Sequence, residues 1–380
     1  MTRDFLPLSL LALSLAGSAW ANPHAASPGA SSLDVSADGV RVHLLSAETA
    51  GDGATRLLHF ASSDSGNTWS EAVRVDEGQA PPYSPHRGFD PQIAVSGDKL
   101  VAAWTTAGTD RWGSGPIATA RSNDGGRTWR AGPDPADDGL TTGHGFLDLA
   151  ADAEGVFHLV WLDSRDGRQG LRYAKSEDGG ANWSPNRTLQ AGTCECCRNT
   201  LSIGPRGNPA VLFRDHDPRD MKVVFTENGE WKKPLVAGDF GWKFDGCPHT
   251  GGGLAATSLG LSALVWTGSP DHVGVHFVRP GHPGSTRLGG PFATHPDLAS
   301  DASDVLLAVW QERTEEGSVL RHTLSHDDGA TWGEARPVPE AAPSAIHPLV
   351  VATADGFLVA WTEKPEGSPA RWRSIRVPLP

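Results

Sequence analysis

The stretch Ser176–Trp183 reads Ser-Glu-Asp-Gly-Gly-Ala-Asn-Trp, and its pattern, Ser-x-Asp-x-Gly-x-x-Trp, recurs along the chain. Three further copies and one reduced copy are Ser62–Trp69, Ser122–Trp129, Ser325–Trp332 and Thr226–Trp231. Ser and Asp side chains accept hydrogen bonds from backbone amides a few residues on. Gly permits a positive φ angle, and Trp is a large apolar group that can fold back over the turn. The repeated stretch therefore predicts a hairpin turn with its own apolar anchor.

A second pattern recurs around these turns, with a period of about 50 residues that is typical of propeller blades. Each unit has a run of apolar, often β-branched residues bounded by turns, which indicates a buried strand. These runs are Val40–Leu45, Lys99–Trp104, Val156–Trp161, Pro209–Phe213, Leu261–Trp266, Val305–Trp310 and Phe357–Trp361. The units start near residues 32, 90, 146, 200, 251, 295 and 346. We therefore expect an all-β chain, a β-propeller of four-stranded antiparallel blades, with seven blades favoured over six and the last closed by a strand from the N-terminus.

The composition suits a propeller and narrows the classes of partner. The chain has 380 residues, with 45 Gly and 29 Pro for many short strands and turns. Its formal net charge of -13 argues against a nucleic acid or an anionic membrane as partner. The apolar run Phe5–Ala16, followed by the small residues around Ala19–Ala21, is typical of an export signal. We expect a signal peptide at 1–21, a linker at 22–31 and a single propeller at 32–380, in a periplasmic or secreted protein with no membrane span in the mature chain.

The repeated turn resembles the Asp-box of sialidases and other bacterial-neuraminidase-repeat proteins. This resemblance implies that each box caps the turn between the two outer strands of a blade, on the face away from the binding site. The box is thus evidence for the fold and carries little information about activity. Sialidases grip the substrate carboxylate with three Arg, use a Tyr nucleophile helped by a Glu, and use an Asp as acid. They also carry a Phe/Tyr-Arg-Ile-Pro motif near the N-terminus, and this sequence has none.

The chain has two tyrosines, and they give a second test of whether it can be a sialidase. Tyr173 falls in a third strand, away from the expected site, so Tyr83 in a Pro-rich loop is the remaining candidate nucleophile. Arg198, Arg214 and Arg313 are candidate ligand-binding arginines, although no motif singles them out. The sequence therefore argues against a classical sialidase.

Histidines and cysteines occupy one recurring position, just before the inner strand of six successive units. These residues are His86, His144, Cys194, Cys196, Cys197, Cys247, His249, His295 and His347. Each inner strand of a propeller begins at one end of the central channel, so we expect these side chains to ring the mouth of that channel. Thiolate and imidazole together are ligands for zinc, copper and iron. Copper is favoured because soft thiolates hold Cu(I) well, and zinc is the alternative.

Two other interpretations of the cysteines stay open. Cys247 could form a disulfide with Cys194, Cys196 or Cys197, as cysteines of exported proteins commonly do. A redox-active thiol pair is the third interpretation. The sequence therefore predicts a propeller that binds a metal ion as a binding or accessory protein. The alternatives are an exo-α-sialidase-type glycosidase, a metal-dependent oxidase, and a disulfide-stapled propeller for a protein or for a small anionic or sugar ligand.

Overall fold

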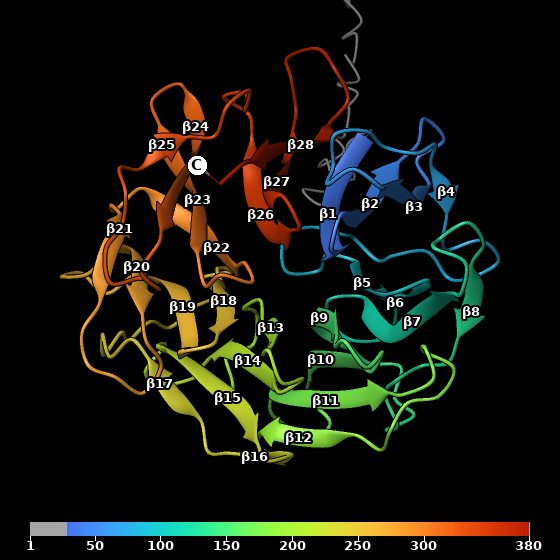
Figure 1. Cartoon of the computed structure of the whole chain (residues 1–380). Helices are drawn as coiled ribbons and strands as arrows, with labels where there is room; N and C mark the ends of the chain where they lie inside the picture. The colour runs from blue at the N-terminus through green and yellow to red at the C-terminus, as the bar shows by residue number, and fades with distance from the viewer. Residues whose placement is uncertain (1–28, 380) are drawn as a thin grey trace, which may run out of the picture.

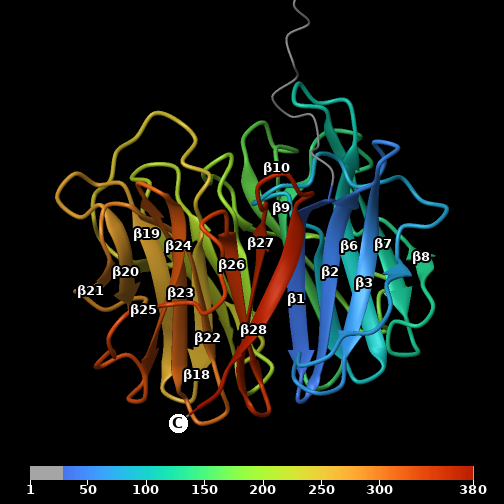
Figure 2. The same cartoon turned by 90° about the horizontal axis from the view of Figure 1, so that it is seen from above.

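The computed structural model describes residues 29–379, which form seven antiparallel β-sheets arranged as the blades of a propeller (Figure 1). The chain enters each blade at its innermost strand and leaves from an outer strand, so consecutive blades follow one another around the ring. Seen at right angles to this view, the strands run between two opposite faces of the ring (Figure 2). The predicted all-β architecture with seven blades is confirmed.

The strands of the first four blades are β1 (Gly29–Asp38), β2 (Arg41–Thr49), β3 (Thr55–Ser62), β4 (Val73–Arg74); β5 (Gln92–Ser96), β6 (Lys99–Ala107), β7 (Ser114–Ser122), β8 (Arg130–Gly132); β9 (Gly145–Ala151), β10 (Phe157–Asp163), β11 (Gly170–Ser176), β12 (Arg187–Gln190); and β13 (Thr200–Ile203), β14 (Pro209–Arg214), β15 (Met221–Glu227), β16 (Glu230–Trp231), β17 (Leu235–Ala237). The strands of the last three blades are β18 (Gly252–Thr257), β19 (Gly260–Thr267), β20 (Gly274–Val278), β21 (Thr286–Gly289); β22 (Ala293–Ser300), β23 (Leu306–Thr314), β24 (Gly317–Ser325), β25 (Arg336–Pro337); and β26 (Ile346–Thr353), β27 (Gly356–Glu363), β28 (Arg371–Val377).

The second strand of a blade forms much of the core. Trp104, Trp161, Trp310 and Trp361 lie on four of these strands and are all but completely buried. Trp161 packs with apolar residues of both its own blade and the preceding one, among them Val101 and Leu147. The apolar runs are thus buried because each blade covers the face of its neighbour.

The repeated Ser-x-Asp-x-Gly-x-x-Trp stretches connect third and fourth strands, as the turn chemistry predicts. In the turn after β24, the backbone N–H of Gly329 donates to Ser325 Oγ at 2.7 Å, and that of Thr331 donates to Asp327 Oδ1 at 2.8 Å. Trp332 then packs edge-on against Phe277 of the preceding blade. The strands alternate in direction, so these turns lie on the face opposite to the one where the inner strands begin. We call the latter the entry face.

The ring closes through contacts between the first and last blades. The seventh blade has three strands among residues 29–379, and the expected fourth strand from the N-terminal segment is not among them. Instead, the N–H of Ala30 donates to the carbonyl of Ala370 at 2.9 Å, just before β28. β1 begins at Gly29, inside the segment 22–31 that was expected to be a linker. The expected signal peptide at 1–21 lies outside the described residues. Within residues 29–379, no helix has the length and apolar character needed to cross a membrane.

Candidate functional site

The backbone turns sharply where the chain enters several blades. Phe146, His249, His295 and His347 have φ angles of 56°, 53°, 49° and 55°, in the left-handed region. Each lies at or just before the beginning of an inner strand on the entry face. Such angles are uncommon for residues other than glycine, and they concentrate at functional sites. The repeated conformation turns the chain at the same point of four blades.

His295 and His347 come together on the entry face. Their ring centroids are 4.5 Å apart and the rings are nearly perpendicular, at 79°. Burial, followed by the charges of Arg87 and Arg198, lowers the pKa of His295 to about 3. Burial and the neighbouring His295 lower the pKa of His347 well below its usual value. Both imidazoles are therefore neutral at neutral pH, the form in which a histidine binds a metal ion.

Two arginines flank these imidazoles. Arg87 is 7% exposed, and its single hydrogen bond among the described residues is a long one of 3.5 Å to the carbonyl of Pro348. Within residues 29–379, its other guanidinium nitrogens make no hydrogen bond. Arg198 donates to the carbonyl of Gly252 at 2.9 Å and to Asp297 Oδ1 at 3.3 Å. Burial and the like charge of Arg198 lower the pKa of Arg87 to about 10. The pair thus offers unused N–H donors at the centre of the entry face.

Aspartates of the inner strands lie beneath this group. Asp34, Asp148 and Asp297 each accept a backbone N–H from the inner strand of the next blade, those of Ile93, Leu201 and Val350. Burial raises the pKa of Asp148 to about 7, and burial together with Asp148 raises that of Asp34. These three side chains therefore link neighbouring blades, and burial makes the Asp34 and Asp148 carboxyl groups hold their protons more tightly than exposed ones do.

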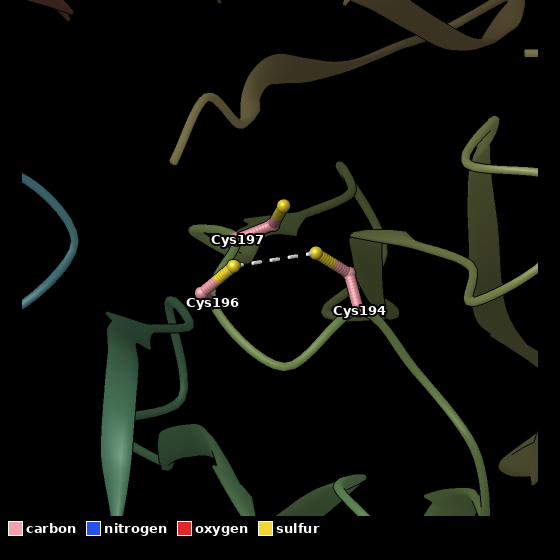
Figure 3. A group of neighbouring side chains, drawn as sticks. All are labelled: Cys194, Cys196 and Cys197. Carbon is pink, nitrogen blue, oxygen red and sulfur yellow. Dashed lines mark hydrogen bonds between the residues drawn. The ribbon is translucent and has the colours of Figure 1, made fainter. Parts of the chain in front are cut away.

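A group of sulfur atoms forms the second part of the site (Figure 3). Cys194, Cys196 and Cys197 lie in the loop before β13, and their sulfurs are all within 4.8 Å of one another. Cys194 Sγ is 3.9 Å from Cys196 Sγ. Cys196 forms a disulfide with Cys247, with Cα atoms 5.8 Å apart, so one of the three alternative pairings is present. This disulfide joins the loop that enters the fourth blade to the loop that enters the fifth.

The remaining two cysteines are free thiols and both are buried. A hydrogen bond from Cys197 lowers the pKa of Cys194 to about 7, helped by the charges of Arg214 and Arg219. Burial raises the pKa of Cys197 well above its usual value. The pair therefore loses a first proton, from Cys194, more readily than two isolated buried thiols would, and the second proton stays on Cys197. The sulfurs of Cys196 and Cys247 also lie within 4.8 Å of a ring nitrogen of His249.

Two of the predicted metal ligands, His86 and His144, make other contacts than the histidines and cysteines above. His86 is exposed, stacks on Phe89 at 5.3 Å and uses Nδ1 in a 2.7 Å hydrogen bond with the carbonyl of Ser84. Its charge acts on His249 and His347, so it belongs to the same face. His144 is buried, with Nδ1 2.7 Å from the carbonyl of Thr142 and Nε2 3.1 Å from Asp138. Both nitrogens of His144 are thus engaged, Nδ1 by a backbone carbonyl and Nε2 by the Asp138 carboxylate, and neither faces the other histidines.

Of the four candidate ligand-binding residues, Arg198 alone lies beside the histidines. Arg214 is buried and donates to backbone carbonyls, including those of Thr250 and Trp266 at 3.0 and 2.9 Å. Arg313 is exposed and covers the ring of Phe292. Tyr83 donates its hydroxyl to the carbonyl of Trp112 at 2.5 Å. Within residues 29–379, no carboxylate contacts that hydroxyl.

Sequence reasoning missed Arg87 and the three inner-strand aspartates. A signal for two of the aspartates was present, because Asp148 follows His144 by four places and Asp297 follows His295 by two, each in an apolar strand. A charged residue at a repeated register of a buried strand indicates a partner in the neighbouring strand. Arg87 directly follows the predicted ligand His86. No sequence pattern shows that its side chain points into the protein rather than to the surface.

Comparison with known proteins bears on the fold. No family model matches the chain, and no curated protein matches it. Among solved structures, the chain is similar to an ulvan lyase, a polysaccharide lyase bound to GlcA(1-4)Rha3S, with a TM-score of 0.60, 13% identity, and coverage of 93% of this chain and 95% of that one. It is also similar to the intramolecular trans-sialidase from Ruminococcus gnavus in complex with oseltamivir carboxylate, with a TM-score of 0.52, 10% identity, and coverage of 92% and 95%. The described residues therefore form a seven-bladed β-propeller, with a fold similar to those of these two proteins.

Proposed function

We propose that this chain is an exported Asp-box propeller that binds a soft metal ion, copper(I) first and zinc second, as a binding or accessory protein. The observation that carries the proposal is the convergence of the Cys194, Cys196 and Cys197 sulfurs within 4.8 Å, two of them free thiols. Thiolates select Cu(I) over the harder divalent ions. Export, signalled by residues 1–21, is part of the same proposal.

The donor set fits such an ion. A thiol must lose its proton to bind a metal, and the hydrogen bond from Cys197 already brings the pKa of Cys194 to about 7. Arg214 and Arg219 act on the same sulfur and would offset the negative charge of the thiolates. Cys194 and Cys197 would hold the ion, and His249 with the sulfurs of Cys196 and Cys247 would add ligands when the disulfide is reduced. The bound ion would supply soft Lewis acidity or a one-electron redox couple.

Cu(I) titration against a chromophoric chelator tests this proposal. The non-reduced protein should take up one equivalent, and a Cys194→Ser/Cys197→Ser variant should take up none. A Cys196→Ser/Cys247→Ser variant is the matched control, because it removes two cysteines but keeps the two free thiols. X-ray absorption of the loaded protein should show sulfur ligands. Equal uptake by the two variants, or no uptake by the wild type, would contradict metal binding at this cluster.

A second candidate function is supported by the arginine pair. The guanidinium of Arg87, with one long hydrogen bond among the described residues, lies beside Arg198 and the neutral His295 and suits the carboxylate of an acidic sugar. The ulvan lyase and the trans-sialidase, with their saccharide and carboxylate ligands, lend support by analogy of fold alone. We propose that such a carboxylate would lie against the two guanidinium groups. Nucleophilic attack by Tyr83 has no support in its contacts, because its hydroxyl is bonded to a carbonyl and, in the part of the chain that the structure describes, to no carboxylate.

Calorimetric titration with uronate- or sialate-containing oligosaccharides tests this second function. Wild-type protein should bind acidic and not neutral oligosaccharides, and Arg198→Met should weaken binding by at least about tenfold, since a hydrogen bond to a charged group contributes roughly 1.5–3 kcal/mol. Arg313→Met is the control, because Arg313 is exposed and covers Phe292. Product analysis of the same mixtures shows whether the sugar is cleaved. Equal affinity of the two variants would exclude the arginine pair as the binding site.

A further inference from the structure

The disulfide between Cys196 and Cys247 has two unlike ends. Cys196 is 6% exposed and lies among buried residues of the third and fourth blades. Cys247 is exposed to solvent, in the loop that enters the fifth blade. A free thiol, Cys194, contacts only the buried end, with its sulfur 3.9 Å from that of Cys196. Figure 3 shows the side chains of Cys194 and Cys196 pointing toward each other across the loop.

We propose that Cys194 exchanges with this disulfide inside the folded protein, which makes Cys247 a latent surface thiol open to modification by small disulfides and electrophiles. Nothing in this proposal depends on a metal ion. The reaction is intramolecular, so the burial of Cys194 does not prevent it. The buried end of the disulfide is reached from within the protein, and the exposed end is the one released.

The step balances without an external oxidant or reductant. The Cys194 thiol loses its proton to solvent, and its sulfur attacks Cys196 Sγ. A Cys194–Cys196 bond forms, the Cys196–Cys247 bond breaks, and its electron pair leaves on Cys247 Sγ, which then takes a proton. The protein holds one disulfide and two thiols before and after. A small approach is needed, because reacting atoms in near-attack geometry are roughly 3–3.5 Å apart.

Cys197 is a poorer attacking group than Cys194, although its sulfur also lies within 4.8 Å of Cys196. Cys196 and Cys197 are neighbours in sequence, and a disulfide between adjacent residues departs from the preferred geometry. The released Cys247 lies beside His249, whose ring nitrogen can donate to the leaving sulfur. The geometry therefore selects one attacking thiol and one released thiol.

Alkylation under native conditions tests the exchange. Wild-type protein is incubated with iodoacetamide and a chelator, without reductant, then acid-quenched, digested and mapped by mass spectrometry. The expected label is on Cys247, with a disulfide linking Cys194 to Cys196. Cys194 and Cys197 should not be labelled before unfolding, because both are buried. An unlabelled Cys247 with the Cys196–Cys247 disulfide intact would overturn the proposal, and this wild-type result needs no variant.

Two serine variants identify the attacking thiol. Cys194→Ser should reduce labelling of Cys247 to background, whereas the matched Cys197→Ser variant should still be labelled there. Tryptophan fluorescence confirms that each variant is folded, since several of the 14 tryptophans are buried between blades. Labelling of Cys247 at the wild-type rate in Cys194→Ser would refute the assignment. The alkylation is done without metal, so its outcome is independent of the copper titration. Either experiment can fail while the other succeeds.

Discussion

Replacing Asp148 by Asn should change how the stability of the protein depends on pH. Asp148 lies on inner strand β9, and one carboxylate oxygen accepts the N–H of Leu201 at 2.5 Å. Asn keeps an oxygen for this bond and removes the ionisable group. Burial, with a further contribution from Asp297, raises the pKa of the Asp148 carboxyl to about 7 in the folded protein.

The sign and size of the effect follow from linkage. An unfolded Asp has a pKa of about 3.9, so the folded state binds this proton more tightly than the unfolded state. The corresponding stability is present at low pH and is lost as the pH rises from about 4 to about 7. A shift of about three pH units, at about 1.36 kcal/mol per unit, makes the loss at most about 4 kcal/mol. Asp148→Asn should therefore gain stability relative to wild type as the pH rises through that window.

Urea unfolding at half-unit steps from pH 4 to pH 8 measures this difference. Most other carboxylates titrate equally in both proteins, so the difference between the two curves isolates Asp148 and its neighbours. Any constant offset, from the new amide group, does not depend on pH. Asp271→Asn, at an exposed position, is the control and should follow the wild-type curve. Parallel curves for wild type and Asp148→Asn would show that the carboxyl ionises inside the protein without cost, and the reasoning would be refuted.

Three further predictions concern the fold and the site. In Gly253→Ala, the new Cβ would lie 2.2 Å from the backbone nitrogen of Leu298, so packing of β18 against β22 should weaken by about 1–3 kcal/mol, and an unchanged urea midpoint would contradict this close approach. Ser325→Ala removes the acceptor for the N–H of Gly329 and should cost about 1 kcal/mol in urea unfolding, whereas His326→Ala at the exposed neighbouring position should cost nothing measurable. The imidazole signals of His295 in NMR should not shift between pH 8 and pH 5, because burial holds its pKa near 3; a midpoint near 6.5 would show that the ring is open to water.

The blades and their order could be predicted from sequence because each is encoded locally. The pattern from Ser176 to Trp183 contains its own hydrogen-bond acceptors, its own glycine and its own apolar anchor. The apolar runs ending in tryptophan repeat at the same spacing, and β13 begins at Thr200, where the fourth unit was expected. The recurring entry position followed from the same repeat, because the chain enters every blade at the same place.

Tertiary structure decided which of these entry residues meet. Cys196 and Cys197 are neighbours in sequence, yet one forms the disulfide with Cys247 and the other stays a free thiol. In the third blade it is Phe146 that has the left-handed conformation His295 has in the sixth, and His144, two residues earlier, turns toward Asp138. A turn or strand depends on contacts within a few residues, which the sequence displays directly. A pairing between loops of different blades depends on the rotation between those blades and on the direction of each side chain, and these exist only once the ring has closed.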